Sequence, residues 1–514
     1  MMTKDRRGSS TYSQVMPAVL LLALCFGGCG TPPEEDEPDA AEEDEPRGLR
    51  LTTPHASPGY VLYNPNLSDT TYLIDIEGRV VHTWESDYGP GGGSYLLENG
   101  HLLRASDVAD APVFSGGGEA GRIEEFTWDG EVVWEFIFAT EGHRLHHDMA
   151  VLPNGNLLGI AWEHKSAVEA TQAGRRPELT PEGGLWPDMI VEIEPQPPDA
   201  GRVVWTWHMW DHTLQNHDPE LSNYGEPAEH PELIDINGDQ DTPELSAEEL
   251  ARLRALGYVP SDTDRDDLSS DFMHTNAVAY NAELDQIVLS VPRFNELWVI
   301  DHSTTTVEAA GNTGGRWGRG GDLLYRWGNP GTYGRGGAAD QRLFFQHDVQ
   351  WVPESMPGAG HLMLFNNNIE DPDGNYSAVF ELAPPVDDAG AYVVPEDEDE
   401  PFGPVAPVWS YMAPDKVSLY SFFISGAHRL SNGNTFITDG RKGRFLEVTS
   451  EGEIVWEYWT PYAGDGEGNP TTLANPHSVF RATKIPPDHP VLAGRALAPL
   501  DPQPPVVLPA APES

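Results

Sequence analysis

The stretch LHHDMAVLPNGNLLGIAW, residues 145–162, predicts two antiparallel strands joined by a tight turn. Apolar residues alternate as far as the turn PNGN at residues 153–156, in which asparagine and glycine tolerate a positive φ. His147 lies at the mouth of the first strand, beside Asp148. Variants of this hairpin recur along the chain, and each follows a second recurring unit of apolar strand, Asp/Glu-Gly turn and Val-Val-Trp strand. We infer both the fold and the candidate site from this repetition.

The repetition predicts an all-β fold, a six-bladed β-propeller over residues 58–492. Each unit supplies about four short strands, which is the content of one propeller blade. Residues 59–63 form a spare strand that can complete the last blade and close the ring, which leaves no free sheet edge. A β-sandwich is the alternative, but it gives no reason to repeat an Asn-Gly hairpin at one place in each unit.

The third unit carries a long insertion at residues 212–270. Within it, the segment SAEELARLRAL at residues 246–256 predicts a helix, because Ser246 and Glu249 form a capping box and Gly257 ends the pattern. The sequence therefore predicts a propeller with a helical insertion in the third blade.

The two ends of the chain are expected to lie outside the propeller. Residues 1–29 have the pattern of a lipoprotein-type signal peptide, with basic residues, an apolar run and small residues before Cys29. Cys29 is the expected lipidation site, which predicts an extracytoplasmic protein anchored in a membrane, the outer membrane facing the periplasm or the cell surface. Residues 30–57 are acidic and proline-rich and predict a disordered tether, and residues 493–514 predict a Pro/Ala-rich tail.

The overall charge limits the class of partner. The 514 residues include 30 Lys and Arg against 82 Asp and Glu, a formal net charge of -52. This balance argues against a nucleic-acid partner, because phosphate binding needs a basic face. An anionic ligand would have to be held by local positive groups, since the field of the whole protein repels it. The sequence makes no prediction of oligomeric state.

Histidines occupy related places in successive units. His147, His274 and His347 each precede an inner apolar strand, and His428 and His477 lie at similar places in the last two units. Because inner strands begin around the central channel of a propeller, we expect these imidazoles to form a ring. Such a ring could bind a metal ion or an oxyanion, or supply a nucleophile with its acid and base.

A second candidate site is acidic and lies in the insertion. Oxygen-bearing side chains alternate as at the start of a calcium loop, in the order Asp235, Asn237, Asp239 and Asp241. The twelfth position is Ser246 rather than glutamate, so the match is incomplete, and an acidic solvated loop is the alternative. A calcium ion in residues 235–241 is the one cofactor considered, and none is expected to be required.

Several motifs resemble the bacterial arylsulfate sulfotransferase family: HHDMAVLPNGN, DFMHTNAVAYNAELDQIVLS, QHDVQWVP, SGAHRLSNGNTFITDGRKGRFLEVT and SVFRATKIPPDHP. The resemblance covers about residues 58–492. It implies a six-bladed propeller with its site in the channel. It also implies transfer of a sulfuryl group from an aryl sulfate donor to a phenolic acceptor, without a nucleotide donor and through a transient sulfohistidine.

The resemblance also implies roles for individual residues. His428 lies in the unit expected to hold the nucleophile, with His347 in reserve, and His274 and His347 are expected to bind the sulfuryl group and move protons. The family has an arginine soon after an Asn-containing strand, but none follows Asn366 here; Arg293 is the first substitute. The predicted substrate-binding residues are Arg293, His147, Asn276, Asn366, His477 and Arg429.

Two other functions stay open at this point. The chain could be a non-catalytic propeller that binds an anionic or aromatic ligand, which the missing arginine favours. It could also hold a metal ion in the ring of histidines.

Overall fold

The computed structural model describes residues 46–108, 113–239, 250–251, 254, 259, 263–397, 399–464, 476–495 and 497–506. In this part of the chain, most apolar runs pair as antiparallel strands of six sheets. The sheets, each given from its innermost strand outward, are β27 (Val479–Ile485), β2 (Tyr60–Pro65), β3 (Thr70–Asp75) and β4 (Val80–Glu85); β5 (Pro90–Leu96), β6 (Leu102–Asp107), β7 (Gly121–Phe126) and β8 (Val132–Ile137); β9 (His143–Val151), β10 (Leu157–Glu163), β11 (Asp188–Gln196) and β12 (Ala200–His208); β15 (Ala277–Asn281), β16 (Gln286–Val291), β17 (Glu296–Asp301) and β18 (Tyr325–Trp327); β19 (His347–Trp351), β20 (Leu362–Ile369), β21 (Tyr376–Leu382) and β22 (Trp409–Tyr411); β23 (Gly426–Arg429), β24 (Thr435–Asp439), β25 (Arg444–Val448), β26 (Ile454–Trp459) and β1 (Gly48–Thr52).

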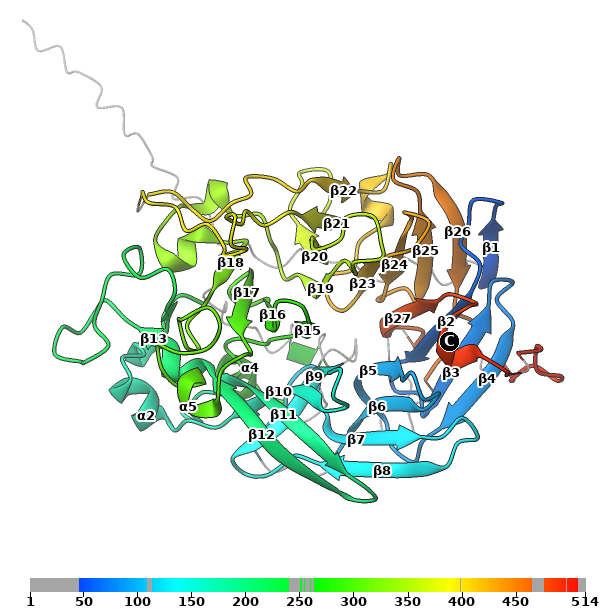
Figure 1. Ribbon diagram of the computed structural model, residues 1–514, viewed down its shortest axis with the longest axis horizontal. Helices are drawn as coiled ribbons and strands as arrows, with labels where there is room; N and C mark the ends of the chain where they lie inside the picture. Colours follow the sequence, from blue (N-terminus) through cyan, green and yellow to red (C-terminus); the bar gives the residue numbers. More distant parts are fainter. Residues whose placement is uncertain are drawn as a thin grey trace, which may run out of the picture. The chain divides into compact units, whose positions relative to one another are not determined.

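The six sheets are the blades of a β-propeller (Figure 1). Each innermost strand contacts the innermost strand of the next sheet, in the order β27, β5, β9, β15, β19, β23 and again β27. The ring is closed by strands from opposite ends of the chain, because β2 pairs with β27 and Tyr60 lies opposite Ile485. The six-bladed propeller and its closing strand are therefore confirmed.

The hairpin at residues 145–162 folds as the sequence predicts. β9 pairs with β10 across a turn in which Gly155 has a φ of +86°, and the Leu152 amide donates to the Asn156 carbonyl at 2.8 Å. Every residue of β10 is buried, whereas the outer strand β12 is half exposed. β10 is covered on both faces, which explains why its sequence is a nearly continuous apolar run.

Tryptophans pack between neighbouring blades. Trp205 and Trp207 of β12 share one buried core with Trp298 of β17 and with Ile160 and Ile287 of the intervening strands. The Trp207 indole N–H, fully buried, donates to the Gly321 carbonyl at 2.7 Å. The sheets are therefore joined by large aromatic side chains whose polar atoms are satisfied.

The structure corrects both predicted boundaries of the propeller. Residues 48–52, assigned to the tether, form β1, which pairs with β26 at the outer edge of the last blade. In the predicted tail, the Leu500 amide donates to the Val80 carbonyl at 2.9 Å, and the Gln503 side chain binds the amide and carbonyl of Val80. Short polar segments at both ends are thus ordered by pairing with strands already in place.

Helices are short throughout the described residues. The α-helices are α2 (Ala167–Gln172), α4 (Arg265–Ser270) and α5 (Thr306–Ala309). The 3₁₀ turns are η1 (Pro177–Leu179), η2 (Met209–His212), η3 (Pro330–Tyr333), η4 (Ala338–Asp340), η5 (Lys416–Ser418) and η6 (Pro490–Leu492). The insertion also holds a pair of short strands, β13 (Thr213–Leu214) and β14 (Ile234–Asp235). The helix predicted at residues 246–256 lies almost wholly outside the described residues and stays a prediction, as do the signal peptide and Cys29. Among the helices that are described, none has the length and apolarity needed to cross a bilayer.

Candidate active site

Histidines gather where the inner strands begin. His147 lies in β9, His274 precedes β15, and His347 opens β19, so the residues come from three successive blades. His147 and His274 have φ values of +56° and +58°, a left-handed conformation that costs a non-glycine residue about 1–3 kcal/mol. The surrounding structure holds this strain in place, which is typical of functional sites.

We define the imidazole cluster as His146, His147, His274 and His347. The ring centres of His147 and His274 are 4.5 Å apart, and the Nδ1 atoms of His146 and His147 are 2.8 Å apart. Each of the four residues is at least 95% buried. Burial and the neighbouring imidazoles, His274 first among them, lower the pKa of His147 well below its usual value. His147 is therefore neutral at pH 7.

Two buried carboxylates bind imidazoles of the cluster. Asp188 Oδ1 lies 3.1 Å from His146 Nε2, and Asp271 accepts a hydrogen bond from His274 Nδ1. Trp162 Nε1 donates to the other oxygen of Asp271 at 2.9 Å. Burial acts to raise the pKa of Asp271, but the charge and hydrogen bond of His274 outweigh it, and that pKa is lowered. Asp271 therefore holds the proton on His274 Nδ1 and orients that ring.

His347 has both ring nitrogens engaged. Nδ1 lies 2.9 Å from Asn367 Oδ1, and Nε2 accepts the Ile424 amide N–H at 3.1 Å. Burial lowers the pKa of His347 to about 3. Because the lone pair of Nε2 already accepts a hydrogen bond, His347 is better placed to position its neighbours than to attack a substrate.

An arginine that the sequence reasoning missed lies beside the cluster. Arg481 of β27 donates from Nη1 to Asp148 Oδ2 at 2.8 Å and to the Tyr95 hydroxyl at 2.7 Å, and its Nε lies 2.9 Å from Asp348 Oδ1. Burial opposes the charge, yet the two aspartates raise the pKa of Arg481 well above its usual value. The positive charge of Arg481 also acts on His147 and His347. Arg481 is therefore a buried cation beside the cluster, at a position not among the predicted site residues.

The aspartates that follow the histidines connect the blades. Asp148 Oδ2 accepts the Val278 amide N–H of β15 at 3.2 Å, and Asp348 Oδ2 accepts the Ala427 amide N–H of β23 at 2.9 Å. Each His-Asp pair thus joins its own inner strand to the next one. Arg481, on a third strand, binds both aspartates. We call Asp148, Asp348 and Arg481 the charged layer; its two aspartates directly follow His147 and His347 in the sequence.

His428 lies apart from the imidazole cluster. Its Nε2 accepts the Lys484 amide N–H at 3.2 Å, and burial lowers its pKa to about 4. With Arg481 and Asp348, it lines a cavity of about 1190 Å³ that also includes the turn at residues 152–157. Among the described residues, no hydrogen bond or ring contact connects His428 to the cluster. The predicted nucleophile therefore faces the hairpin end of the channel.

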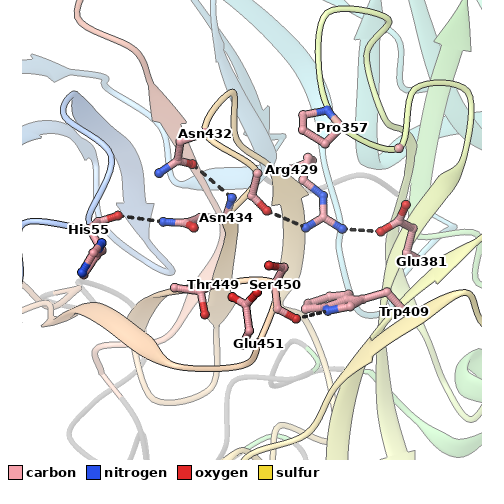
Figure 2. A pocket seen from close by; sticks show the side chains of 12 residues that line it. His55, Pro357, Glu381, Trp409, Arg429, Asn432, Asn434, Thr449, Ser450 and Glu451 are labelled. Atoms are coloured by element: carbon pink, nitrogen blue, oxygen red, sulfur yellow. Dashed lines mark hydrogen bonds and ion pairs between the residues drawn. The ribbon is translucent and has the colours of Figure 1, made fainter.

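Arg429, a predicted substrate-binding residue, lies apart from the imidazole cluster, on the other face of β23 from His428. Its guanidinium pairs with Glu381 and lies 5.0 Å from the Trp409 ring (Figure 2). These residues line a separate cavity of about 580 Å³ together with His55. Alternation along β23 explains the difference, because successive side chains point to opposite faces and His428 occupies the channel side.

The other predicted residues have mixed positions. Arg293 donates to the Leu268 carbonyl at 3.1 Å, and its charge contributes to the lowered pKa of Asp271, so it lies near the cluster. The remaining three bind backbone: Asn276 donates to the Gln346 carbonyl, Asn366 bonds Arg342 and Phe344, and His477 Nδ1 lies 3.0 Å from the Tyr462 carbonyl. In the described part of the chain, no hydrogen bond or ring contact joins Asn366 or His477 to the cluster.

The predicted calcium loop gains no support. The Asp239 carboxylate pairs with both terminal nitrogens of Arg175, and Asp235 Oδ1 accepts the Asn237 amide N–H at 2.9 Å. Asn237 Oδ1 accepts the Arg176 amide N–H, also at 2.9 Å. Asp241 is outside the described residues, among which no group of three or more His, Cys, Asp or Glu side chains is placed to hold a metal ion.

Gly118 offers a direct test of the position of His147. A Cβ on Gly118 would lie 2.3 Å from His147 Nε2, and the φ of Gly118 is +75°. We expect Gly118→Ala to displace the imidazole of His147. If the sulfuryl transfer that the resemblance implies takes place at this cluster, its rate should fall about 100-fold or more, the usual effect of a misplaced catalytic group. Gly155→Ala is the matched control, since its φ is +86° and its Cβ would meet nothing within 4 Å. Equal losses of rate in the two variants would contradict the assignment.

Acid should destabilise the protein. Burial lowers the pKa values of His347, His428 and His477 to about 3, 4 and 4, so each takes up a proton more readily when unfolded, and each costs about 2 kcal/mol of stability by pH 5. Asp348, whose pKa burial raises to about 7, acts oppositely by about 2.5 kcal/mol. From these four groups, urea unfolding should give a free energy about 3.5 kcal/mol lower at pH 5 than at pH 7.5, and His147, whose pKa is also lowered, adds to this loss. His477→Asn should reduce that difference, and equal stability at both pH values would refute it.

Comparison with known proteins identifies the family. The family model described as Arylsulfotransferase (ASST) matches residues 51–458. No curated protein matches the chain. Similar solved structures include a protein of unknown function from Bacteroides caccae, with 12% identity and a TM-score of 0.41, covering 84% of this chain and 99% of that one. A putative 6-phosphogluconolactonase from Bacteroides fragilis has 9% identity and a TM-score of 0.37, with the same coverage. On the family match, the chain belongs to the arylsulfotransferase family of sulfotransferases, which act without the nucleotide donor PAPS.

Proposed function

We propose that the imidazole cluster transfers a sulfuryl group from an aryl sulfate to a phenol, with Nε2 of His147 as the nucleophile. The proposal rests on the protonation state and the surroundings of the His147 ring. His147 is neutral, it lies beside His274, and its Nε2 has no hydrogen-bond partner among the described residues. An imidazole nitrogen in this state can attack sulfur and later leave.

The first half-reaction uses His274 as the acid. The lone pair of His147 Nε2 forms a bond to sulfur, and the bond from sulfur to the aryl oxygen breaks, with its electron pair going to that oxygen. In this step His274 starts protonated, with its Nδ1 proton held by Asp271, and gives its other proton to the departing phenolate. The products are a phenol and a sulfuryl group on His147.

The second half-reaction reverses these roles. An acceptor phenol gives its proton to His274, its oxygen bonds to sulfur, and the nitrogen–sulfur bond breaks to restore neutral His147. Arg481 supports both steps, because its positive charge lies close to His147 and favours an anionic sulfuryl group there. The high pKa of Arg481 keeps that charge at every working pH.

Burst kinetics test the proposal. Mixing the protein with a chromogenic aryl sulfate and no acceptor should release one equivalent of phenol per protein rapidly, and a phenolic acceptor should then give parallel lines in double-reciprocal plots. The non-catalytic binding propeller predicts saturable binding of the aryl sulfate with no phenol released. Absence of a burst, with turnover only when both substrates are bound together, would reject the covalent step.

We also propose that the protein works outside the cytoplasm on a membrane surface, attached through Cys29. The supporting observation is the signal pattern at residues 1–29 followed by an acidic segment. Metabolic labelling with a fatty acid should mark the wild-type protein and not Cys29→Ser.

A further inference from the structure

A chain of hydrogen bonds runs from a buried carboxylate to the proposed nucleophile. Asp188 Oδ1 lies 3.1 Å from His146 Nε2, and His146 Nδ1 lies 2.8 Å from His147 Nδ1. The three residues are 1%, 1% and 3% exposed, so water does not compete for these contacts. Nothing in the sequence motifs indicates this connection, because Asp188 follows the hairpin by a whole loop and opens β11.

We propose that Asp188 and His146 are positioning residues that hold His147 in the tautomer with its proton on Nδ1. The proposal rests on the function proposed above for His147. Ionised Asp188 only accepts hydrogen bonds, and its Oδ2 already takes the Thr275 amide N–H at 2.8 Å. Its Oδ1 must then accept the proton of His146 Nε2.

The tautomer of His146 fixes that of His147. In neutral His146 with its proton on Nε2, Nδ1 carries a lone pair and can only accept. The contact at 2.8 Å therefore requires the proton of neutral His147 to lie on Nδ1. The lone pair of His147 is left on Nε2, which is the atom that attacks sulfur.

The surroundings also fix the planes of both rings. The His146 imidazole lies flat on the Trp162 indole, with ring centres 4.1 Å apart and an angle of 6° between the planes. The backbone of His147 is held by its amide, which donates to the Gly118 carbonyl at 2.7 Å. Neither ring can turn without breaking a buried contact, so the hydrogen-bond chain is preorganised.

The hydrogen-bond chain from Asp188 to His147 can also move positive charge during the reaction. When His147 Nε2 bonds to sulfur, its ring becomes cationic and still holds a proton on Nδ1. That proton can pass to His146 Nδ1, which places the positive charge beside the Asp188 carboxylate, and it returns when the nitrogen–sulfur bond breaks. A buried cation is thereby paired with an anion instead of being left in an apolar environment.

Asp188→Asn tests the proposal because it exchanges donor and acceptor in each hydrogen bond between residue 188 and His147. The asparagine oxygen can still accept the Thr275 amide, but its NH₂ now faces His146 Nε2, which has to accept. His146 then donates from Nδ1, and the proton of His147 moves to Nε2. We expect the burst rate constant to fall about 10³–10⁴-fold, as in the serine protease triad when an Asp→Asn change imposes the wrong histidine tautomer. Asp285→Asn is the matched control, because Asp285 binds His302 at 2.9 Å outside the cluster.

Nitrogen NMR of histidine-labelled protein gives a readout that a merely structural role would not move. In the wild type, the His147 signals, assigned with His147→Asn, should show a protonated Nδ1 and a bare Nε2, and Asp188→Asn should exchange the two. A bare Nδ1 in the wild type overturns the proposal without any variant, as does a wild-type burst in Asp188→Asn. Sulfuryl label on another residue would reject the nucleophile itself, whatever the tautomer of His147.

Discussion

Replacing His147 by asparagine should abolish the burst of phenol and lower kcat by a factor on the order of 10⁶, the effect of deleting a nucleophile. Asparagine is chosen because it tolerates the φ of +56° better than most residues and so adds little backbone strain. The variant still folds into the same channel but lacks the atom that bonds to sulfur. Stopped-flow absorbance with a chromogenic aryl sulfate measures the loss, and thermal unfolding checks the fold.

His428→Asn is the matched control for this prediction. His428 accepts the Lys484 amide and lines the cavity at the hairpin end of the channel, so its replacement should change kcat only a few-fold. The sequence alone predicted the opposite ranking, with His428 as nucleophile. A burst that survives in His147→Asn and disappears in His428→Asn would restore that earlier assignment.

Removing the charge of Arg481 should have the largest effect on stability. Arg481→Met leaves Asp148 and Asp348 buried without their cation, and breaking a buried pair on one side costs about 3–5 kcal/mol. Arg481→Lys should recover only part of this, because one ammonium cannot reproduce the fork that reaches both carboxylates. Urea unfolding at pH 7.5 measures the free energies. Transfer activity should fall in both variants, since His147 and His347 adjoin these aspartates in sequence.

A combined variant separates pairing from packing. Adding Asp148→Asn and Asp348→Asn to Arg481→Met removes all the charges together, so much of the lost stability should return while the activity does not. If the free energy of unfolding of Arg481→Met alone is within 1 kcal/mol of the wild-type value, the charged layer does not stabilise the channel as described.

The repeated hairpin made the fold predictable, because each unit carries its own turn chemistry and its own apolar strands. The same regularity predicted that His147, His274 and His347 lie on or beside inner strands; His347 opens β19 and His274 precedes β15, whereas His147 lies within β9. The prediction fails where a segment becomes a strand only by pairing with a distant part of the sequence. β1 could not be separated from the acidic segment before it, since five residues become a strand only because β26 offers an edge.

The partners of the histidines were harder to foresee. His146 and Asp188 lie on different strands of one blade, and Arg481 comes from another blade. Nothing in their local sequence indicates that they meet the site histidines. Asp271 precedes His274 by only three residues, so the sequence alone places this carboxylate near its histidine. The place of His428 depends on register: Asp348 accepts the amide of Ala427, and the next side chain, His428, lines the cavity at the hairpin end.

The position of the sulfuryl label tests the central claim most directly. The protein would be mixed with a sulfur-labelled aryl sulfate without acceptor, quenched in alkali to preserve an acid-labile sulfohistidine, and mapped by peptide mass spectrometry. The account predicts a single label on the peptide containing His147, released as aryl sulfate when a phenol is added before the quench. A label on His274, His347 or His428, with none on His147, would contradict it.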